Sequence, residues 1–370
     1  MKELFIGLMS GTSVNSIDSV LINLSDKKIK ILKQCSTEIK KELKTKILEA
    51  VNKEEIINQE ITSLNREVAQ VFAEAVLSLL VKSSIDSSEI LAIGSHGQTI
   101  KHSPHSFNPY SLQVGDPQTI SQITGIKTVA DFRTSDIKAG GEGAPLAPLF
   151  HQFIFNRQNL TEAVVINIGG ISNLTYLSKL KEGVIGYDCG PGNCLIDAWT
   201  RDNNKGDYDE KGAWASSGKL NPELLNLMAR DSFFHIKHPK STGPDYFNLN
   251  WVYKKISLLK QTPSNQDVQA TLTELTAQII FLEIKKLNAL KNKIYICGGG
   301  IHNNFLIKRI EKKIQNKTFS TSSLGVDPDY MEAACFAWLA QQRIKKNTFD
   351  LSKITGSKGK VSLGKIWDPS

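Results

Sequence analysis

The feature that most constrains this chain is a strand, a turn of small residues and a second strand, which occurs once in each half of the sequence. Apolar residues 4–8 and 18–24 predict two strands, and the turn between them contains Met9-Ser10-Gly11-Thr12-Ser13. In the second half, residues 163–167 and 174–177 predict strands that flank a turn from Asn167 to Asn173 with two adjacent glycines. Two similar halves in 370 residues favour two α/β lobes over a single domain.

Strands and helices are expected to alternate along the rest of the chain. Apolar residues at three- and four-residue steps predict an amphipathic helix over 56–80. Further strands are expected at 29–33, 91–94, 112–114, 128–130, 183–187 and 294–297. Further helices are expected at 193–200, 222–229, 252–259, 266–287, 303–315 and 329–345. Residues 95–99 and 102–143 are expected to form loops with short elements, and the lobe boundary is expected near residues 145–162.

Composition excludes several classes of protein. With 40% hydrophobic and 22% charged residues the chain is globular, and its apolar stretches are far shorter than the roughly 20 residues of a membrane helix. The N-terminus lacks the features of a secretory signal, so a cytoplasmic protein without a membrane partner is expected. Five sparse cysteines predict reduced thiols. The net charge of +8 comes from scattered lysines without interleaved aromatics, so no nucleic-acid partner is expected.

Three glycine-rich turns are candidate nucleotide-binding elements. Gly11-Thr12-Ser13 offers donors that suit phosphate oxygens, although a lone turn of this kind is more often an ordinary hairpin. The turn at Gly169-Gly170 has the same position in the second half, and two such turns can hold a triphosphate from both sides. Gly298-Gly299-Gly300 follows a buried strand and would let an adenosine approach the backbone. A helix-initiating turn that needs positive φ is the structural alternative there.

Three charged or titratable residues at strand ends are candidate catalytic or substrate-binding groups. Asp188 follows strand 183–187 and precedes a Gly-Pro-Gly turn, where a carboxylate can act as general base; a turn-forming Asp bonded to its own backbone is the alternative. Arg133 can form a bidentate pair with a phosphate or a substrate carboxylate, or a structural pair with Asp131. His96 is more often a hydrogen-bonded loop residue than an acid or base, so it is assigned substrate contact at most.

Taken together, these segments resemble the anhydro-N-acetylmuramic acid kinase family, a branch of the superfamily of actin, sugar kinases and heat-shock chaperone ATPases. The resemblance extends almost from end to end, over Gly7–Ser13, Gly94–Thr99, Gly115–Pro117, Ala130–Arg133, Gly140–Leu146, Asn167–Gly170, Asp188–Asn193, Gly212–Ala215, Pro239–Gly243, Cys297–Asn303 and Asp327–Ala333. It implies an α/β fold of two actin-like, ribonuclease H-like lobes, with mixed sheets flanked by helices and a cleft between them. The expected domains are residues 1–155, to which a tail of about residues 346–370 could return, and residues 156–345.

The resemblance also implies an activity and its residues. The family cleaves the 1,6-anhydro ring of anhydro-N-acetylmuramic acid while phosphorylating the sugar with ATP and Mg²⁺, which gives N-acetylmuramic acid 6-phosphate and ADP in cell-wall recycling. Asp188 matches the catalytic base, and Asp18 is a candidate Mg²⁺ ligand through a water. The implied ATP-binding residues are Gly11, Thr12, Ser13, Val14, Asn15, Ser16, Ile17, Asp18, Asn167, Gly169, Gly170, Gly298, Gly299 and Gly300. The implied sugar-binding residues are His96, Gln98, Thr99, Asp116, Asp131, Arg133 and Glu332.

One departure from the family pattern concerns the first turn. After Gly11-Thr12-Ser13 the family usually continues with an apolar residue and then Asp-Gly, whereas this chain has Val14-Asn15-Ser16. Loss of the acid removes a negative charge near the phosphates and could weaken Mg²⁺ positioning. Two alternatives stay open: a non-catalytic muropeptide or sugar sensor, and a kinase or ATPase of the same fold with another sugar as substrate. The sequence does not set the oligomeric state, for which a homodimer is one option.

Overall fold

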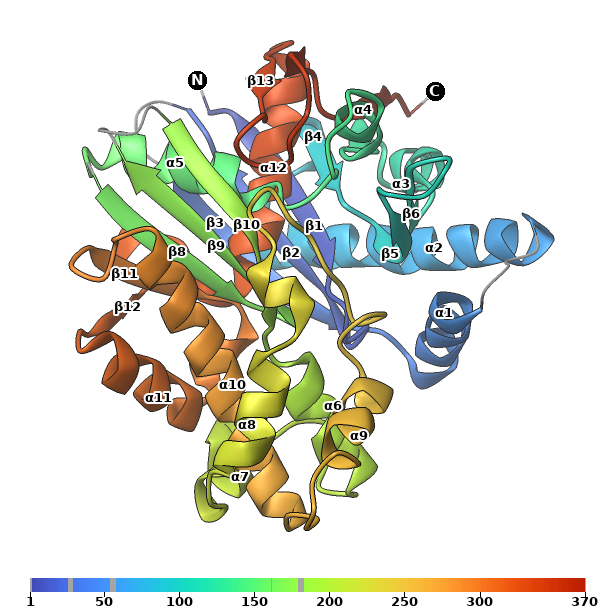
Figure 1. The fold of residues 1–370 in the computed structure, drawn as a ribbon. Coiled ribbons are helices and arrows are strands. Elements are labelled where there is room, and N and C mark those ends of the chain that lie inside the picture. Colours follow the sequence, from blue (N-terminus) through green and yellow to red (C-terminus); the bar gives the residue numbers. More distant parts are fainter. Residues whose placement is uncertain (1, 26–28, 54–57, 161, 179–182, 370) are drawn as a thin grey trace. The chain divides into compact units, whose positions relative to one another are not determined.

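The computed structural model describes residues 2–25, 29–53, 58–160, 162–178 and 183–369 (Figure 1). Residues 56 and 57, at the start of the first expected helix, lie outside the described residues. The chain divides into two compact units, residues 1–150 with 330–370, and residues 151–329. The sequence pattern instead assigned residues up to 155 to the first domain and residues 330–345 to the second. The difference arises at α12 (Met331–Ile344), which packs on strands of the first unit.

A six-stranded mixed sheet forms the centre of the first unit. Its order is β15-β7-β4-β1-β2-β3. Strand β1 is antiparallel to β2 but parallel to β4, and β4 is parallel to β7, so the sheet changes from a meander to a parallel arrangement at β1. The bounds are Leu4–Ser10 (β1), Ser16–Asn23 (β2), Lys30–Glu38 (β3), Ile90–Ser95 (β4), Thr128–Ala130 (β7) and Lys365–Trp367 (β15).

Helices and two small hairpins surround this sheet. The hairpins are β5 (Gln98–Ser103) with β6 (Tyr110–Val114), and β13 (Phe349–Asp350) with β14 (Lys360–Val361). The helices are α1 (Lys41–Asn52), α2 (Asn58–Ser83), α3 (Pro117–Thr124), α4 (Thr134–Lys138), and α5 (Ala147–Arg157), which continues into the second unit. The expected loop at 95–99 is wrong at its end, because residues 98 and 99 begin β5 and pair with β6. Helices α1 and α5 were not predicted.

Two glycines let α12 approach the sheet closely (Figure 1). Gly7 of β1 and Gly94 of β4 are register partners on adjacent parallel strands. A Cβ on Gly7 would overlap the carbonyl oxygen of Ala333, and a Cβ on Gly94 would overlap that of Phe336. Any larger residue therefore forces the helix away from the sheet. On the other face, α2 contributes Phe72, Val76 and neighbouring apolar side chains to the core.

The second unit repeats the strand order of the first. Its sheet runs β10-β9-β8-β11-β12, in which β8, β9 and β10 form an antiparallel meander and β11 and β12 are parallel to β8. This is the arrangement of β3-β2-β1-β4-β7, so the predicted repeat and the ribonuclease H-like fold are confirmed. The bounds are Glu162–Ile168 (β8), Ile171–Ser178 (β9), Gly183–Pro191 (β10), Lys293–Cys297 (β11) and Thr318–Ser320 (β12).

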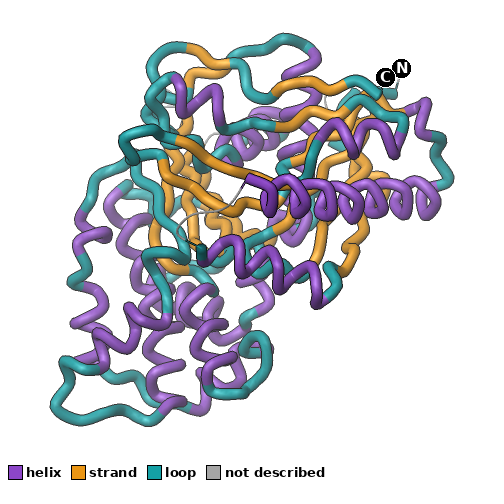
Figure 2. Tube along the Cα trace, turned by 90° about the vertical axis from the view of Figure 1, so that its right-hand side faces the viewer, coloured by secondary structure: helices purple, strands orange, loops and turns teal. Residues whose placement is uncertain are grey.

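Helix α10 is the central helix of the second unit, and α7, α8 and α11 pack against it (Figure 1). Most of its residues are buried, from Val268 to Ile284. The helices of this unit are α6 (Cys194–Asp202), α7 (Ala213–Ser217), α8 (Pro222–Ala229), α9 (Leu249–Ile256), α10 (Asn265–Lys286) and α11 (Asn304–Ile314). Figure 2 distinguishes these helices from the strands by colour. In the described ranges no helix has the length and apolar character needed to cross a membrane.

We predict that Gly94→Ala lowers the melting temperature, because the added methyl overlaps the α12 backbone, which cannot rotate out of the way as a side chain can. Overpacking of this kind costs about 1–3 kcal/mol of unfolding free energy. Thermal unfolding followed by circular dichroism measures it. Gly299→Ala is the matched control, because no atom lies within 4 Å of the Cβ that it adds. Equal melting temperatures for the two variants would contradict the close packing of α12.

Candidate active site

Asp188 lies at a β-bulge in β10. Asp188 pairs with Asn173 and Gly190 pairs with Ser172, so Cys189 is an extra residue in this strand. A bulge bends its strand and turns the side chain before it away from the regular pleat. The Ser172 hydroxyl donates to the Gly190 carbonyl at 3.1 Å and holds the bulge in place. The strand therefore continues to Pro191, beyond the predicted end at residue 187.

Backbone groups of residues 240–242 hold Asp188. The amide of Asp188 donates to the Lys240 carbonyl at 3.1 Å, and the amide of Thr242 donates to Oδ2 of Asp188 at 3.0 Å. The Asp188 side chain is buried apart from a small exposed fraction of the residue, 7%. A carboxylate oriented by a main-chain donor and still reachable from solvent suits a general base. These two contacts come from a distant segment of the chain, not from the turn that follows Asp188.

The second glycine turn packs directly on the turn that follows Asp188. The Gly169 carbonyl accepts the amide of Asn193 at 2.8 Å, and the Gly170 carbonyl accepts the amides of Gly192 and Cys194 at 2.9 and 3.0 Å. A Cβ on Gly192 would overlap the Gly169 carbonyl oxygen. The first turn of α6 thus fixes the conformation of the predicted phosphate turn, and the structure brings Gly169 and Gly170 into the same region as the Asp188 strand.

The third turn, Gly298–Gly300, follows β11 beside the end of β8. Gly298 has φ of 79°, and a Cβ there would overlap Oδ1 of Asn167, while one on Gly300 would overlap the Ile168 side chain. These two positions support the structural reason for glycine, since they let the turn pack on β8. Gly299 differs, because no atom lies within 4 Å of a Cβ built on it. Its open side fits an approaching nucleotide base or ribose.

The first glycine turn, in the other unit, is strained at one residue. Strand β1 continues through Ser10, so the turn begins at Gly11. Val14 has φ of 52°, a left-handed conformation that is unusual for a β-branched residue, and its amide donates to the Gly11 carbonyl at 3.1 Å. Strain of this kind is common at ligand-binding turns. Nζ of Lys44, on α1, donates to Oδ1 of the exposed Asn15 at 2.5 Å.

His96 and Arg133 form a fixed pair in the first unit. Nε of Arg133 donates to Nε2 of His96 at 3.1 Å, and Nη1 donates to the Gly143 carbonyl at 2.6 Å. Because Nε2 accepts, the proton of the neutral ring lies on Nδ1, which donates to the Gly97 carbonyl at 2.9 Å. Burial, and then the charge of Arg133, hold the pKa of His96 well below its usual 6.5. Both ring nitrogens are therefore engaged, and His96 orients Arg133.

Glu332 lies close enough to Arg133 and to Asp18 for their charges to interact. Burial raises the pKa of Glu332, Arg133 lowers it, and the negative charge of Asp18 raises it again. The structure thus brings four sequence-predicted residues together in the first unit, namely Asp18, His96, Arg133 and Glu332. Within the described ranges no three His, Cys, Asp or Glu side chains gather into a metal site. Asp18 is a carboxylate of the kind that Mg²⁺ uses beside its phosphate and water ligands.

Other predicted residues have structural partners. Asp116 caps α3, because its Oδ2 accepts the amide and the hydroxyl of Thr119 at 2.9 and 2.5 Å. Asp131 pairs with Lys365 at 2.7 Å. The Gln98 side chain donates to the Thr99 carbonyl at 3.2 Å. The roles of these residues toward a sugar stay predictions.

Buried polar atoms near the glycine turns fit a bound ligand. Among the described residues, no partner is found for Oγ of Ser10, at the end of β1, or for Oδ1 of Asn173, which faces Asp188 in the β9–β10 pairing. Polar groups buried in this way are normally satisfied by water or ligand.

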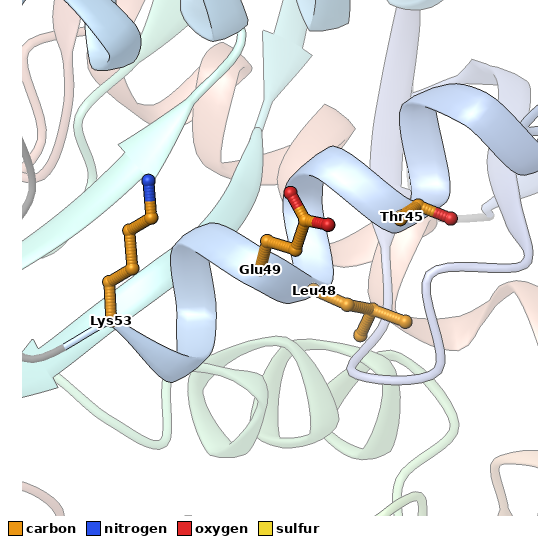
Figure 3. Close-up of a pocket in the computed structure, with 4 residues that line it drawn as sticks. All are labelled: Thr45, Leu48, Glu49 and Lys53. Carbon is orange, nitrogen blue, oxygen red and sulfur yellow. The ribbon is translucent and has the colours of Figure 1, made fainter.

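A separate shallow hollow lies beside α1, lined by Thr45, Leu48, Glu49 and Lys53 (Figure 3). None of the sequence-predicted site residues is among these four.

The sequence pattern did not single out the groups that support Asp188. Lys240 stands out only as part of the segment Pro239–Gly243, and the sequence around Thr276 and Glu283 of α10 carries no motif. A lysine between Pro and Ser carries no sign of burial, although Lys240 is only 3% exposed. The one signal available was the Pro239–Gly243 segment itself.

A family model described as anhydro-N-acetylmuramic acid kinase matches residues 3–369. The chain belongs to this family. An anhydro-N-acetylmuramic acid kinase from Coxiella burnetii (strain Dugway 5J108-111) is 42% identical over 368 residues, which cover 99% of this chain and 98% of that protein. One from Legionella pneumophila (strain Corby) is 43% identical over the same coverage.

Solved structures also overlap most of the chain, at low sequence identity. The activator of the 2-hydroxyisocaproyl-CoA dehydratase from Clostridium difficile with bound ADPNP has a TM-score of 0.47 at 12% identity and covers 95% of this chain and 99% of that one. A ROK family glucokinase from Streptomyces griseus in complex with glucose and AMPPNP has a TM-score of 0.42 at 13% identity and covers 92% and 99%. Overlaps this loose bear on neither substrate nor mechanism.

We predict a pH dependence of stability that comes from His151, whose Nδ1 lies 2.7 Å from the Thr175 hydroxyl. Burial lowers its pKa to about 3, whereas an unfolded histidine has a pKa of about 6.5. Between these values the unfolded chain binds the extra proton, so the unfolding free energy falls as pH falls, by up to ~1.4 kcal/mol per pH unit. Denaturant unfolding at pH 7.5, 6.0 and 5.0 should show this fall relative to His151→Asn.

The comparison with the variant is needed because Asp197 acts in the opposite sense. Burial raises the pKa of Asp197 to about 7, so its folded form keeps a proton that the unfolded form releases. Asp197 is the same in both proteins, and the difference between them isolates His151. Parallel pH profiles for wild type and His151→Asn would show that His151 has the same pKa in the folded and the unfolded protein, which would contradict this prediction.

Proposed function

We propose that the chain is an ATP-dependent kinase that opens the 1,6-anhydro ring of anhydro-N-acetylmuramic acid and phosphorylates it to N-acetylmuramic acid 6-phosphate. This activity belongs to cell-wall recycling, and a cytoplasmic location agrees with it. The observation that carries the proposal is the carboxylate of Asp188, held at a bulge by the Thr242 amide and adjoining the clamped turn at Gly169-Gly170. Membership of the family supplies the substrate. A homodimer remains compatible with this activity but has no observation in its favour.

Asp188 is the proposed general base. Its carboxylate takes a proton from a water molecule, whose oxygen forms a bond to the anomeric carbon of the sugar. The bond between that carbon and the 6-oxygen breaks, the 6-oxygen bonds to the γ-phosphorus of ATP, and ADP leaves. The Thr242 amide keeps one carboxylate oxygen in a fixed direction during the transfer. Such orientation is a large part of the rate advantage in phosphoryl transfer.

The nucleotide contacts are assigned to the glycine turns and the sugar contacts to the Arg133 region. The backbone amides of residues 11–18 and of the turn at Gly169-Gly170 are proposed to contact phosphates, and the turn at Gly298–Gly300, with Asn167 beside it, to contact adenosine. Mg²⁺, when bound, neutralises charge on the leaving ADP, and Asp18 would hold it through a water. Arg133, oriented by His96, and Glu332 are the proposed sugar-binding groups.

We predict that Asp188→Asn loses turnover but keeps sugar binding. The amide retains the size of the side chain and accepts from Thr242, but it cannot take up the proton. Removal of a general base typically lowers the rate by about 100- to 10,000-fold. ADP release with anhydro-N-acetylmuramic acid, beside plain N-acetylmuramic acid, measures turnover and substrate choice, and calorimetry measures sugar affinity. Asp202→Asn, at the exposed end of α6, is the matched control. Turnover close to wild type in folded Asp188→Asn would eliminate this mechanism.

We predict that Asn15→Asp lowers the Mg²⁺ concentration needed for half-maximal rate and leaves sugar affinity unchanged, because it adds a carboxylate to the phosphate turn. Lys44 contacts this side chain and would compete with Mg²⁺ for the new charge. The shift should therefore be larger in Asn15→Asp combined with Lys44→Met, while Lys44→Met alone is the control. A Mg²⁺ dependence that is identical in all four proteins would place residue 15 away from the metal.

A further inference from the structure

Lys240 and Glu283 form a buried ion pair beside the Asp188 strand. Nζ of Lys240 lies 3.1 Å from Oε1 of Glu283, and the two side chains are 2% and 4% exposed. Nζ also lies 3.5 Å from the Phe233 carbonyl and 4.7 Å from the centre of the Phe233 ring. Lys240 is the sole lysine that is buried among the described residues. A buried ion pair loses much of its attraction to desolvation, so stability alone is a weak reason for this one.

The backbone of Lys240 also contacts Asp188. The Lys240 carbonyl accepts the Asp188 amide, and the amide of Thr242, two residues later, donates to the Asp188 carboxylate. The side chain of Lys240 is fixed to α10 at one end and its main chain contacts Asp188 at the other. The position of the Thr242 donor therefore depends on where Glu283 holds Lys240.

Glu283 also binds strand β10 directly, at the residue that precedes Asp188. The Tyr187 hydroxyl donates to Oε2 of Glu283 at 3.2 Å. Burial raises the pKa of Tyr187 far above its usual 10, so the hydroxyl keeps its proton and remains a donor. One carboxylate thus binds the residue that precedes Asp188 and the segment that lies across from it.

Helix α10 holds the strand on the other side of the bulge as well. Thr276 is seven residues before Glu283, two helical turns away on the same face of α10. Its hydroxyl lies 3.2 Å from the Pro191 carbonyl and 2.9 Å from the Gly192 carbonyl. One face of α10 therefore contacts β10 on both sides of the bulge. Glu283 binds the strand before the bulge, at Tyr187, and Thr276 binds the chain after the bulge, at Pro191 and Gly192.

We propose that the buried Lys240–Glu283 pair is a positioning device that ties the segment 240–242 and β10 to α10 and so sets the direction of the Asp188 carboxylate. The proposal rests on the function proposed above for Asp188. It predicts an effect on kcat rather than on KM, because both side chains are engaged with each other and almost fully buried. A displacement of about 1 Å in a catalytic group can lower the rate by about 100-fold.

The test compares three variants with a matched control. Lys240→Met and Glu283→Gln each remove one charge, and the double variant Lys240→Met/Glu283→Gln removes both. Lys286→Met is the control, since Lys286 also pairs with Glu283, at 2.9 Å, but is half-exposed and is not part of the segment 240–242. We expect Lys240→Met to lower kcat by about 10- to 100-fold with KM for sugar and ATP within about threefold, and Lys286→Met to stay within about twofold of wild type.

The double variant separates positioning from a purely structural role. Lys240→Met alone leaves the buried Glu283 carboxylate without Lys240 and should lower the melting temperature. The double variant removes both charges of the buried pair, so its melting temperature should return most of the way to that of wild type. If the pair positions Asp188, kcat stays low in the double variant although stability returns. Recovery of kcat together with the melting temperature would overturn the proposal, as would a loss expressed in KM alone.

The same assay distinguishes failure of this inference from failure of the proposed function. In the Asp188→Asn background, adding Lys240→Met should cost little further rate, because the group that it positions is already disabled. Turnover close to wild type in Asp188→Asn would reject the function of Asp188 whatever Lys240 does. An inactive Asp188→Asn together with a fully active Lys240→Met would reject only the positioning role.

Discussion

Backbone approaches backbone at several points of this protein only because glycine stands where a Cβ would overlap a neighbouring atom. Gly7 and Gly94 admit α12 to the first sheet, Gly192 lies against the Gly169 carbonyl, and Gly298 packs against Asn167. The close packing of the scaffold and the open turns of the candidate site therefore depend on the same property of glycine, the absence of a side chain.

Buried charged and titratable side chains of this protein are paired with other protein groups. These pairings determine which side chains remain available for catalysis. His96 is neutral because burial and Arg133 suppress its protonation, so its remaining role is to orient the guanidinium. Lys240 is engaged by Glu283 and is almost fully buried. Asp188 differs from both. The Thr242 amide and the Lys240 carbonyl that contact it are main-chain groups, which orient a carboxylate without cancelling its charge.

Much of the fold could be predicted from the sequence, because strands, amphipathic helices and glycine turns depend on patterns of residues that are close together along the chain. The repeat of strand, turn and strand, the helix at 222–229 and the family resemblance all came from such local patterns. Other elements could not be predicted in this way. Strand β5 depends on pairing with β6, and α12 joins the first unit because of contacts with strands more than 200 residues earlier in the chain.

By itself the sequence determined the α/β class, the three glycine turns and the family, and it made Asp188 a candidate general base, since each rests on residue types at short spacing. Only the tertiary structure decided that Asp188 lies at a β-bulge, that His96 is a neutral partner of Arg133, and that Lys240 is buried against Glu283. The last two residues are 43 positions apart. A residue's burial and charge state depend on the atoms that folding brings around it, and no local pattern contains those atoms.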